Sequence, residues 1–217
     1  MYKNGLPTKQ RILDEALTLF SVKGFEPVTV AEIADAVGIK APSLYKHYKS
    51  KQDIFEAIIQ QMDAWYEKQA ASMGINGREA EKDSDLYVNI SIDELVRIGT
   101  GLFLHFLHDE FTCKFRKMLT IEKYGNKELA AMYEARYIDD ALLYQSKIFK
   151  SLSEAGTLIA ENPQVMAMHY YSPVFLLLNM CECHPEREEE ALKMLKQHIW
   201  QFCRLYGISK QPSEETE

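Results

Sequence analysis

A chain of 217 residues has room for one compact domain, or for a small domain joined to a larger one. Hydrophobic residues make up 47% and charged residues 26% of the sequence, which excludes a disordered polymer and allows a sizeable core. No apolar run reaches the ~18 residues of a membrane span, so we expect no membrane contact. Residues 1–5 lack the apolar segment of a signal peptide, and we therefore expect a cytoplasmic protein.

The charge of the chain is unevenly distributed. Residues 1–51 contain eight Lys and Arg against five Asp and Glu, which gives this segment a net charge of +3. The remaining residues carry a net charge of −10, which accounts for the total of −7. A basic segment attached to an acidic remainder is typical of a protein that contacts a polyanion at one end only.

Four cysteines lie within apolar helical patterns: Cys113, Cys181, Cys183 and Cys203. In a reducing cytosol we expect free thiols. The Cys-Glu-Cys-His sequence at 181–184 offers metal ligands, but no second pair stands at the spacing that structural zinc sites use. We therefore predict neither a bound metal nor a cofactor.

Apolar residues at helical spacing run through nearly the whole sequence, and alternating strand patterns are missing. The first helix is predicted to begin with Thr8 as its N-cap and to end at Gly24, with Phe25 folded back onto its last turn. One broad face of this helix is apolar and is expected to be buried: Ile12, Leu13, Ala16, Leu17, Leu19 and Phe20.

A second helix begins with a capping box, in which Thr29 and Glu32 satisfy each other's backbone donors, and it ends at Gly38. After a tight turn, a short third helix is predicted over residues 41–48. It has a proline in its first turn, where the missing amide donor costs nothing.

Ser50, with Asp53 three residues later, is predicted to cap a long fourth helix that runs to about residue 73. Residues 74–85 contain two glycines and many charges, and they are predicted to form a flexible connection. The later helices are predicted over 91–108, 109–124, 127–155 (ended by Gly156), from Asn162 onward with a kink at Pro173, and over 186–206, before a frayed tail at 209–217.

Two short helices joined by a glycine turn, after an amphipathic first helix, form a helix-turn-helix, whose second helix fits the DNA major groove. In the segment 41–48, Leu44 and Tyr48 are four residues apart and are expected to face the core. The outward face is then polar and basic, as contacts to base edges and phosphates require. It comprises Lys40, Ala41, Ser43, Lys46 and His47.

The order of residues in this region is more specific than the helix pattern. It reads Thr29-Val30-Ala31-Glu32-Ile33-Ala34, then Gly38-Ile39, then Ser43-Leu44-Tyr45-Lys46-His47-Tyr48-Lys49-Ser50-Lys51. Over residues 8–60 the chain strongly resembles the N-terminal signature of the TetR family of regulators. The resemblance implies an all-α protein with an N-terminal three-helix helix-turn-helix DNA-binding domain and a C-terminal helical ligand-binding and dimerisation domain.

The resemblance also implies roles for individual residues. Three match positions that contact the phosphate backbone: Thr29, Tyr45 and Lys51. Three match positions that face the groove and reach base edges or phosphates: Ser43, Lys46 and His47. Two positions depart from the family pattern, since Lys40 replaces the usual Ser or Thr cap and Pro42 replaces the usual Gly. Lys40 offers a phosphate contact instead, and Ala41 offers at most a contact with a thymine methyl group.

We accordingly assign residues 1–50 to the DNA-binding domain and residues 51–208 to the effector-binding and dimerisation domain, with the helix 51–73 as connector. The resemblance implies dimerisation through the last two long helices. The sequence supports it with an apolar stripe on the final helix and the apolar run 174–180 on its neighbour, although such stripes also fill monomer cores. The stripe comprises Leu192, Leu195, Ile199, Phe202 and Leu205.

The resemblance further implies a pocket for a small molecule among the middle helices. Ligand cavities are mostly apolar with a few polar anchors. The candidate lining residues are Trp65, Tyr66, Phe103, His105, Phe106, Tyr133, Tyr137, His169 and Tyr170, within a wider set that includes Phe111, Tyr144, Tyr171 and Phe175. Any one of them is more often a core residue than a pocket residue, and the histidines are the candidate anchors.

We therefore expect a repressor that leaves a palindromic operator when a small molecule binds. A connector helix of residues 51–73 would be about 34 Å long, so a tilt at one end would displace the other. The alternatives are a regulator whose ligand promotes DNA binding, an activator, and a helical interaction protein without DNA. An enzyme is disfavoured because the metalloprotease, phosphate-loop, nucleophile-elbow and dinucleotide motifs are missing from the sequence.

Overall fold

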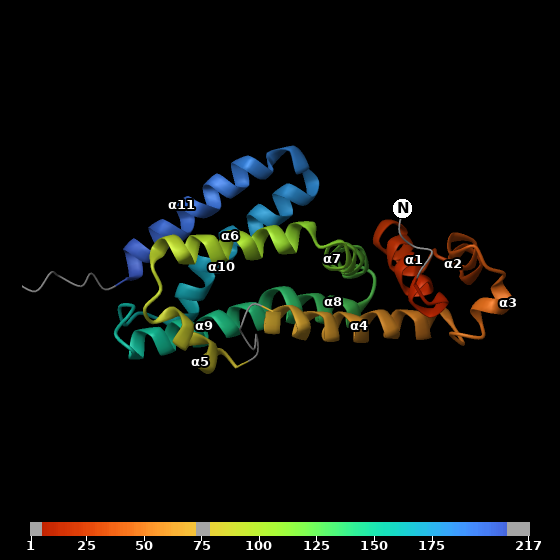
Figure 1. The fold of residues 1–217 in the computed structure, drawn as a ribbon, viewed down its shortest axis with the longest axis horizontal. Helices are drawn as coiled ribbons and strands as arrows, with labels where there is room; N and C mark the ends of the chain where they lie inside the picture. Colours follow the sequence, from red (N-terminus) through yellow and green to blue (C-terminus); the bar gives the residue numbers. More distant parts are fainter. Residues whose placement is uncertain (1–5, 73–78, 208–217) are drawn as a thin grey trace, which may run out of the picture. The chain divides into compact units, whose positions relative to one another are not determined.

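The computed structural model describes residues 6–72 and 79–207 (Figure 1). Within these residues every regular element is a helix, and the one strand-like feature is an isolated antiparallel bridge between Leu158 and Gly207. The predicted all-α class is confirmed. None of the described helices combines the length and the apolar run that crossing a bilayer requires. The predicted tail at 209–217 lies outside the described residues.

The chain separates into two compact units. Unit 1 comprises the residues up to Met73 together with Asp109–Ile138, and unit 2 comprises Gly74–His108 together with the residues from Asp139 onward. These units differ from the predicted segments 1–50 and 51–208, because two helices beyond residue 50 pack against the first helix and a third packs against one of those two. The functional division of the chain at residue 50 stays a prediction.

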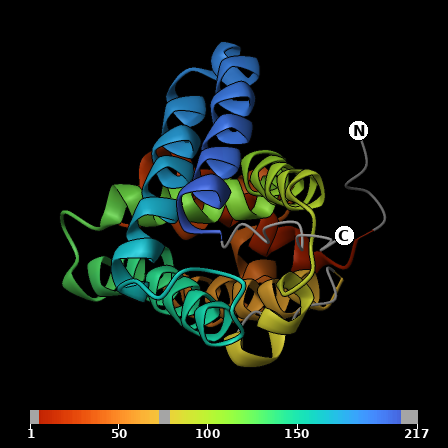
Figure 2. The ribbon, with the colours of Figure 1, turned by 90° about the vertical axis from the view of Figure 1, so that its left-hand side faces the viewer.

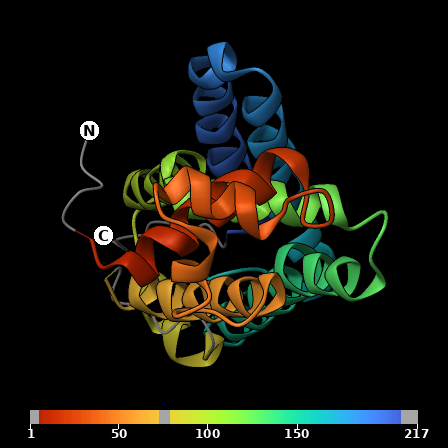
Figure 3. The same ribbon diagram turned by 90° about the vertical axis from the view of Figure 1, so that its right-hand side faces the viewer.

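Unit 1 is built around α1, which packs against α2, α4 and α7. In Figures 1 and 3, α1 to α3 gather at the N-terminal end of the long α4. The largest fully buried side chains of this group include Phe20, Ile33, Leu44 and Ile54. The helices of unit 1 are α1 (Thr8–Lys23), α2 (Val30–Val37), α3 (Ala41–Leu44), α4 (Lys51–Ser72), α7 (Glu110–Glu122) and α8 (Lys127–Glu134).

In unit 2, α10 packs against α9, α6 and α11. Figure 2 shows α10 and α11 side by side. Two core clusters hold this unit, one around Phe149, Met166 and Phe202 and one around Phe103, Leu177 and Leu195. The helices are α5 (Ala80–Asp83), α6 (Ile92–His108), α9 (Asp140–Glu154), α10 (Pro163–Cys183) and α11 (Glu188–Tyr206), with 3-10 turns at Ser84–Tyr87 and Pro185–Arg187.

Most predicted capping residues occupy their expected places. The Ser50 hydroxyl accepts the Asp53 amide at 3.0 Å, and the Asn162 side chain accepts the Gln164 and Val165 amides. Thr8, however, is the first residue of α1 and not its N-cap. The Pro7 carbonyl accepts the Gln10 and Arg11 amides, so the helix already includes Thr8. The prediction of a Thr8 cap is wrong.

Two further boundary predictions need correction. The single helix predicted over 127–155 is interrupted by a π-helical segment, Ala135–Asp139, between α8 and α9. The connection predicted over 74–85 is not wholly irregular, because α5 and the start of a 3-10 turn lie within it; residues 73–78 lie outside the described residues. Apolar periodicity does not resolve such short changes of helix type.

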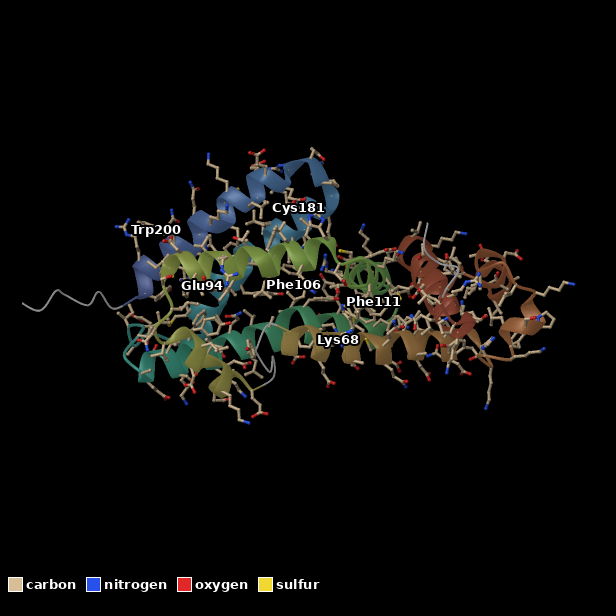
Figure 4. The ribbon with its side chains drawn as sticks, viewed as in Figure 1. Lys68, Glu94, Phe106, Phe111, Cys181 and Trp200 are labelled. Atoms are coloured by element: carbon tan, nitrogen blue, oxygen red, sulfur yellow. The ribbon has the colours of Figure 1, made fainter. Side chains whose placement is uncertain are left out.

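The apolar stripe predicted on the last helix lies mainly in the core of unit 2. Leu195, Ile199 and Phe202 are buried in the two core clusters, and Leu192 packs against one of them. Of the stripe, Leu205 remains exposed, at 63%. The interpretation as monomer core therefore holds for the buried members of the stripe. Other apolar side chains of α10 and α11 are exposed: Val165, Met168, Leu176, Met194 and Trp200, the last of which is labelled in Figure 4.

Candidate nucleic-acid interface and ligand-binding residues

The turn that leads into α2 is fixed by a complete capping box. The Thr29 amide donates to Oε2 of Glu32 at 2.8 Å, and the Glu32 amide donates to Oγ1 of Thr29 at 3.2 Å. Nζ of Lys23 lies 2.8 Å from Oε1 of Glu32. This ammonium, followed by the Thr29 donors, lowers the pKa of Glu32 to about 2. The predicted capping box is confirmed, and α2 begins at a position defined by hydrogen bonds.

Gly38 ends α2 in the left-handed conformation, with φ of 77°. The following Ile39 amide bonds back to the Ala34 carbonyl at 2.9 Å, which closes the turn into α3. The Arg11 guanidinium donates to the Val37 carbonyl and so ties α1 to the end of α2. The helix-turn-helix pair is therefore held at both ends of α2.

The regular part of α3 is shorter than the predicted helix 41–48, since it ends at Leu44. The next residues continue as turns, in which the His47 amide donates to the Leu44 carbonyl at 2.8 Å and the Tyr48 amide donates to the same carbonyl at 3.1 Å. Leu44 and Tyr48 are buried, as predicted, with 0% and 6% exposure. Burial raises the pKa of the Tyr48 phenol.

The candidate groove-facing residues lie on one continuous surface segment. Tyr45 is 52% exposed. Lys40, Lys46 and His47 are also exposed, whereas Ala41 and Ser43 are half-buried. Because Leu44 and Tyr48 anchor the segment from behind, these side chains are presented outward from a fixed backbone.

The two remaining candidates already have partners within unit 1. Oγ1 of Thr29 accepts the amide of Glu32 in the capping box, although the residue is exposed. Nζ of Lys51 lies 2.7 Å from the Phe25 carbonyl and 3.0 Å from the Glu26 carbonyl, and 4.2 Å from the centre of the Phe25 ring. A lysine ammonium has three donors, so Lys51 retains capacity for one more acceptor.

The ligand-binding candidates divide between the two units. Trp65, Tyr66, Tyr133 and Tyr137 belong to unit 1. There the Trp65 ring lies 6.1 Å from that of Phe111, which is labelled in Figure 4, and the rings of Tyr133 and Tyr137 lie 5.2 Å apart. Nε1 of Trp65 is buried and has no hydrogen-bond partner among the described residues.

The other five candidates belong to unit 2. The rings of His105 and Phe106 lie 5.8 Å apart on α6. Phe103 is 1% exposed and belongs to a core cluster, and the half-buried Tyr170 packs against the rings of Phe149 and Phe202. His169 shares a hydrogen bond with the Tyr206 hydroxyl. The role of all nine residues in ligand binding stays a prediction.

The Cys-Glu-Cys-His sequence at the end of α10 does not form a cluster of ligands. Cys181 is buried, and burial raises the pKa of its thiol, whereas Cys183 and His184 are exposed. In the parts of the chain that the structure describes, no group of three or more His, Cys, Asp or Glu side chains is placed to hold a metal ion.

Sequence reasoning missed Glu122, the last residue of α7. The residue is 9% exposed, and Oε1 of its carboxylate accepts the Phe25 amide at 2.7 Å. The signal was present in the sequence, since Glu122 continues the spacing of the buried Phe115, Met118 and Leu119 along α7. A carboxylate on an apolar stripe needs a buried partner.

Residues 12–58 match the family model described as "Bacterial regulatory proteins, tetR family". IcaR, the negative transcriptional regulator of the biofilm operon icaADBC in Staphylococcus aureus strain Newman, is 50% identical to the chain over 48 residues, which are 22% of this chain and 26% of IcaR. The helix-turn-helix region of the chain is therefore similar to that of the TetR family. It spans about a quarter of the length of the curated relative that it matches.

Solved structures of TetR-family proteins share the fold over nearly the whole chain. A putative TetR-family regulator from Mesorhizobium loti has a TM-score of 0.65 at 18% identity, over 93% of this chain and 97% of that one. The complex of SmeT with triclosan has a TM-score of 0.64 at 20% identity, over 97% of each chain. SmeT is the repressor of the Stenotrophomonas maltophilia multidrug efflux pump SmeDEF. The predicted architecture, a helix-turn-helix domain followed by further helices, is thereby confirmed.

Proposed function

We propose that this protein is a homodimeric transcriptional repressor of the TetR family that binds a palindromic operator and releases it when a small molecule binds. The observation that carries the DNA-binding part is the exposed segment from Lys40 to His47, anchored by the buried Leu44 and Tyr48. Its basic side chains and hydroxyl groups are of the kinds that contact DNA phosphates and the edges of nucleobases. We assign the DNA contacts to Thr29, Lys40, Ala41, Ser43, Tyr45, Lys46, His47 and Lys51.

The distribution of charge along the chain also supports DNA contact by the helix-turn-helix region. Residues 1–51 carry +3 and the remainder −10, so the helix-turn-helix region is the part that attracts a polyanion. IcaR, which matches this region, is named a negative regulator, and SmeT is named a repressor. These names support repression as the sign of the regulation.

Dimerisation through α10 and α11 is proposed from their exposed apolar residues. Leu176 and Leu205 are 66% and 63% exposed, and Met168 and Met194 are 53% and 48% exposed. Exposed side chains of this size are stabilised by about 1.5–3 kcal/mol each when they are fully buried. A two-fold symmetric pair of these helices would form a four-helix bundle and would match a palindromic operator.

An apolar effector is proposed from the aromatic candidates in both units. SmeT is described in complex with triclosan, and a small apolar molecule of that kind would suit pockets lined by Trp65, Tyr133 and Tyr137 or by Phe106 and Tyr170. The ligand must prefer the state that does not bind DNA, since equal affinity for both states would shift nothing. The proposal includes no catalytic step.

Coupling between effector and DNA is proposed to run along α4. This helix extends from Lys51 to Ser72 and carries Trp65 and Tyr66 in its second half. At 1.5 Å per residue its length is about 33 Å. Operator half-sites lie about 34–36 Å apart, so a small tilt of α4 in each protomer would take the two recognition segments out of register.

Selection of bound fragments from random duplex DNA tests the function. We expect enrichment of a two-fold symmetric sequence whose affinity falls steeply with salt. Loss of binding on addition of an effector would identify a released repressor, and a gain would identify a ligand-promoted regulator or an activator. Absence of any salt-dependent duplex binding would overturn the proposal and favour a helical interaction protein.

A further inference from the structure

The turn between α1 and α2 lies between two charged side chains that are distant in the sequence. Glu122, from the end of α7, and Lys51, from the start of α4, both bond to backbone atoms of this turn. All these elements belong to unit 1. The turn therefore connects the end of α7 to a residue that we place at the DNA backbone.

On one side, Glu122 holds the amide of Phe25. The distance from this amide nitrogen to Oε1 of Glu122 is 2.7 Å, and Glu122 as a whole residue is 9% exposed. The approach depends on Gly24, because a Cβ atom at that position would lie 2.6 Å from Oε1 of Glu122. A carboxylate that accepts a backbone N–H in a nearly buried position makes a strong, charge-assisted hydrogen bond.

On the other side, the carbonyls of the same turn hold Lys51. Its Nζ donates to the Phe25 carbonyl at 2.7 Å and to the Glu26 carbonyl at 3.0 Å. The Phe25 ring lies under the ammonium at 4.2 Å and packs edge-on against Phe55 of α4, with 4.9 Å between ring centres. The position of the ammonium is thus set by the backbone of residues 25 and 26.

We propose that Glu122 is the positioning residue for Lys51: by holding the amide of Phe25, it fixes the turn whose next two carbonyls, those of Phe25 and Glu26, direct the Lys51 ammonium towards a DNA phosphate. The inference rests on the proposed DNA-binding function. Two of the three ammonium donors are used by the turn, which leaves one donor in a defined direction for a phosphate oxygen. Without Glu122 the turn would lose its hydrogen bond to α7, and its carbonyls would no longer hold the Lys51 ammonium in one orientation.

A second contact keeps α7 in place against the same helix. Nζ of Lys114, two turns before Glu122, donates to Oγ1 of Thr18 on α1 at 2.8 Å. Because α7 is fixed to α1 at this second point, removal of the Glu122 carboxylate would release the turn without detaching α7. The consequence for DNA binding is therefore local to Lys51.

The test uses the full-length protein and a duplex selected from random DNA by the wild type. Glu122→Met keeps the length of the side chain and removes the acceptor. Glu122→Gln keeps an acceptor oxygen for the Phe25 amide, and Lys51→Met removes the ammonium. Glu128→Gln, an exposed carboxylate in the first turn of α8, is the charge-matched control. Affinity is measured by fluorescence anisotropy over a range of salt concentrations.

We expect Lys51→Met to reduce the slope of log affinity against log salt by about 0.9 per protomer, or about 1.8 for a dimer on its operator, which amounts to about a sixtyfold loss at 0.1 M salt. Glu122→Met should lose most of the same slope, and Glu122→Gln should recover affinity to within about twofold of wild type. The double variant Lys51→Met/Glu122→Met should bind no more weakly than Lys51→Met alone. A merely structural role of Glu122 would not change the slope by one phosphate contact per protomer.

The outcomes separate the inference from the function. If the wild type binds no duplex, the proposed function fails. If it binds and Lys51→Met weakens it, but Glu122→Met keeps the wild-type slope or adds its full loss to that of Lys51→Met, the inference is overturned. Should Glu122→Met not fold, amide hydrogen exchange of the wild type decides: protection of the Phe25 amide supports the inference, and rapid exchange overturns it.

Discussion

Nζ of Lys23, at the end of α1, lies 2.8 Å from Oε1 of Glu32, in the first turn of α2. The other oxygen of this carboxylate accepts the Thr29 amide at 2.8 Å. Glu32 thus caps α2 and holds α1 with a single ionised group. Both contacts favour the charged form, and they lower the pKa of Glu32 from 4.5 to about 2.

The Glu32 carboxylate makes the stability of the helix-turn-helix depend on pH in the acidic range. Its pKa is lower in the folded than in the unfolded protein, so its contribution is complete above pH 4.5 and is lost as the pH falls towards 2. We expect Glu32→Gln to unfold at a lower temperature than the wild type at pH 7. The difference should shrink below pH 4.5 and vanish near pH 2. Thermal unfolding followed by circular dichroism measures it.

Glu56→Gln provides the matched control, since Glu56 is an exposed carboxylate on α4 whose side chain pairs with Gln52 on the same helix. This variant loses the same charge but no cap. An equal loss of stability in both variants at pH 7, or a Glu32→Gln effect that persists unchanged at pH 2, would contradict the assignment.

Two glycines in unit 1 should respond unequally to alanine. Gly24 has φ of 82° and ψ of 172°, a conformation essentially confined to glycine, and an added Cβ would meet Oε1 of Glu122 at 2.6 Å. Gly38 has φ of 77° and ψ of 34°, and an added Cβ meets no atom within 4 Å. Gly38→Ala should therefore cost about 1–2 kcal/mol, which is the backbone strain alone.

Gly24→Ala should cost about 3 kcal/mol or more, because backbone strain is joined by the loss of the bond between Glu122 and Phe25. Urea unfolding at neutral pH gives both free energies. An equal loss of unfolding free energy in the two variants would show that the close approach of Glu122 to Gly24 does not contribute to stability.

The cap of α2 and the buried face of residues 41–48 were predictable because their causes are local. Thr29 and Glu32 bond to each other within one turn, and Leu44 and Tyr48 are buried because they lie on the same face of one short segment. Such features depend on residues three or four positions apart. The sequence contains all the information that they require.

The features that were missed depend on contacts between distant residues. Glu122 meets Phe25 across 97 positions, and Leu195 is buried by helices that local spacing does not identify. An apolar stripe indicates that a helix face will be covered, but not whether the same chain or a second copy covers it. For the same reason the sequence did not reveal which aromatic candidates share a unit.

The exposed leucines of α10 and α11 lead us to predict a dimer that forms through these two helices. Leu176 and Leu205 are 66% and 63% exposed, and covering each would contribute about 1.5–3 kcal/mol to a dimer. Replacing both by Glu puts charge into the proposed interface, so we expect a monomer by sedimentation velocity where the wild type is a dimer. Leu143→Glu, on α9 with 56% exposure, is the control and should stay dimeric. Equal behaviour of the two variants would place the interface elsewhere.

Substitutions at Lys46 and His47 can distinguish contacts with DNA phosphates from contacts with bases. Both side chains are exposed, so their replacement by Ala should change the free energy of unfolding by no more than about 0.5 kcal/mol. Removal of a positively charged side chain that contacts a phosphate should lower the salt slope by about 0.9 per protomer and leave the sequence preference intact. A residue that reads a base should cost about 1–3 kcal/mol of binding and relax the preference at one position.

Repeating the selection from random duplex DNA with Lys46→Ala and His47→Ala therefore assigns each side chain to one of these roles. Lys193→Ala, an exposed lysine of α11 in unit 2, is the control and should change neither the slope nor the selected sequence. Because Leu44 and Tyr48 fix the backbone behind both residues, a loss of binding cannot be ascribed to a loosened helix if the unfolding midpoint is unchanged. Wild-type affinity and sequence preference in both variants would mean that this segment does not enter the groove.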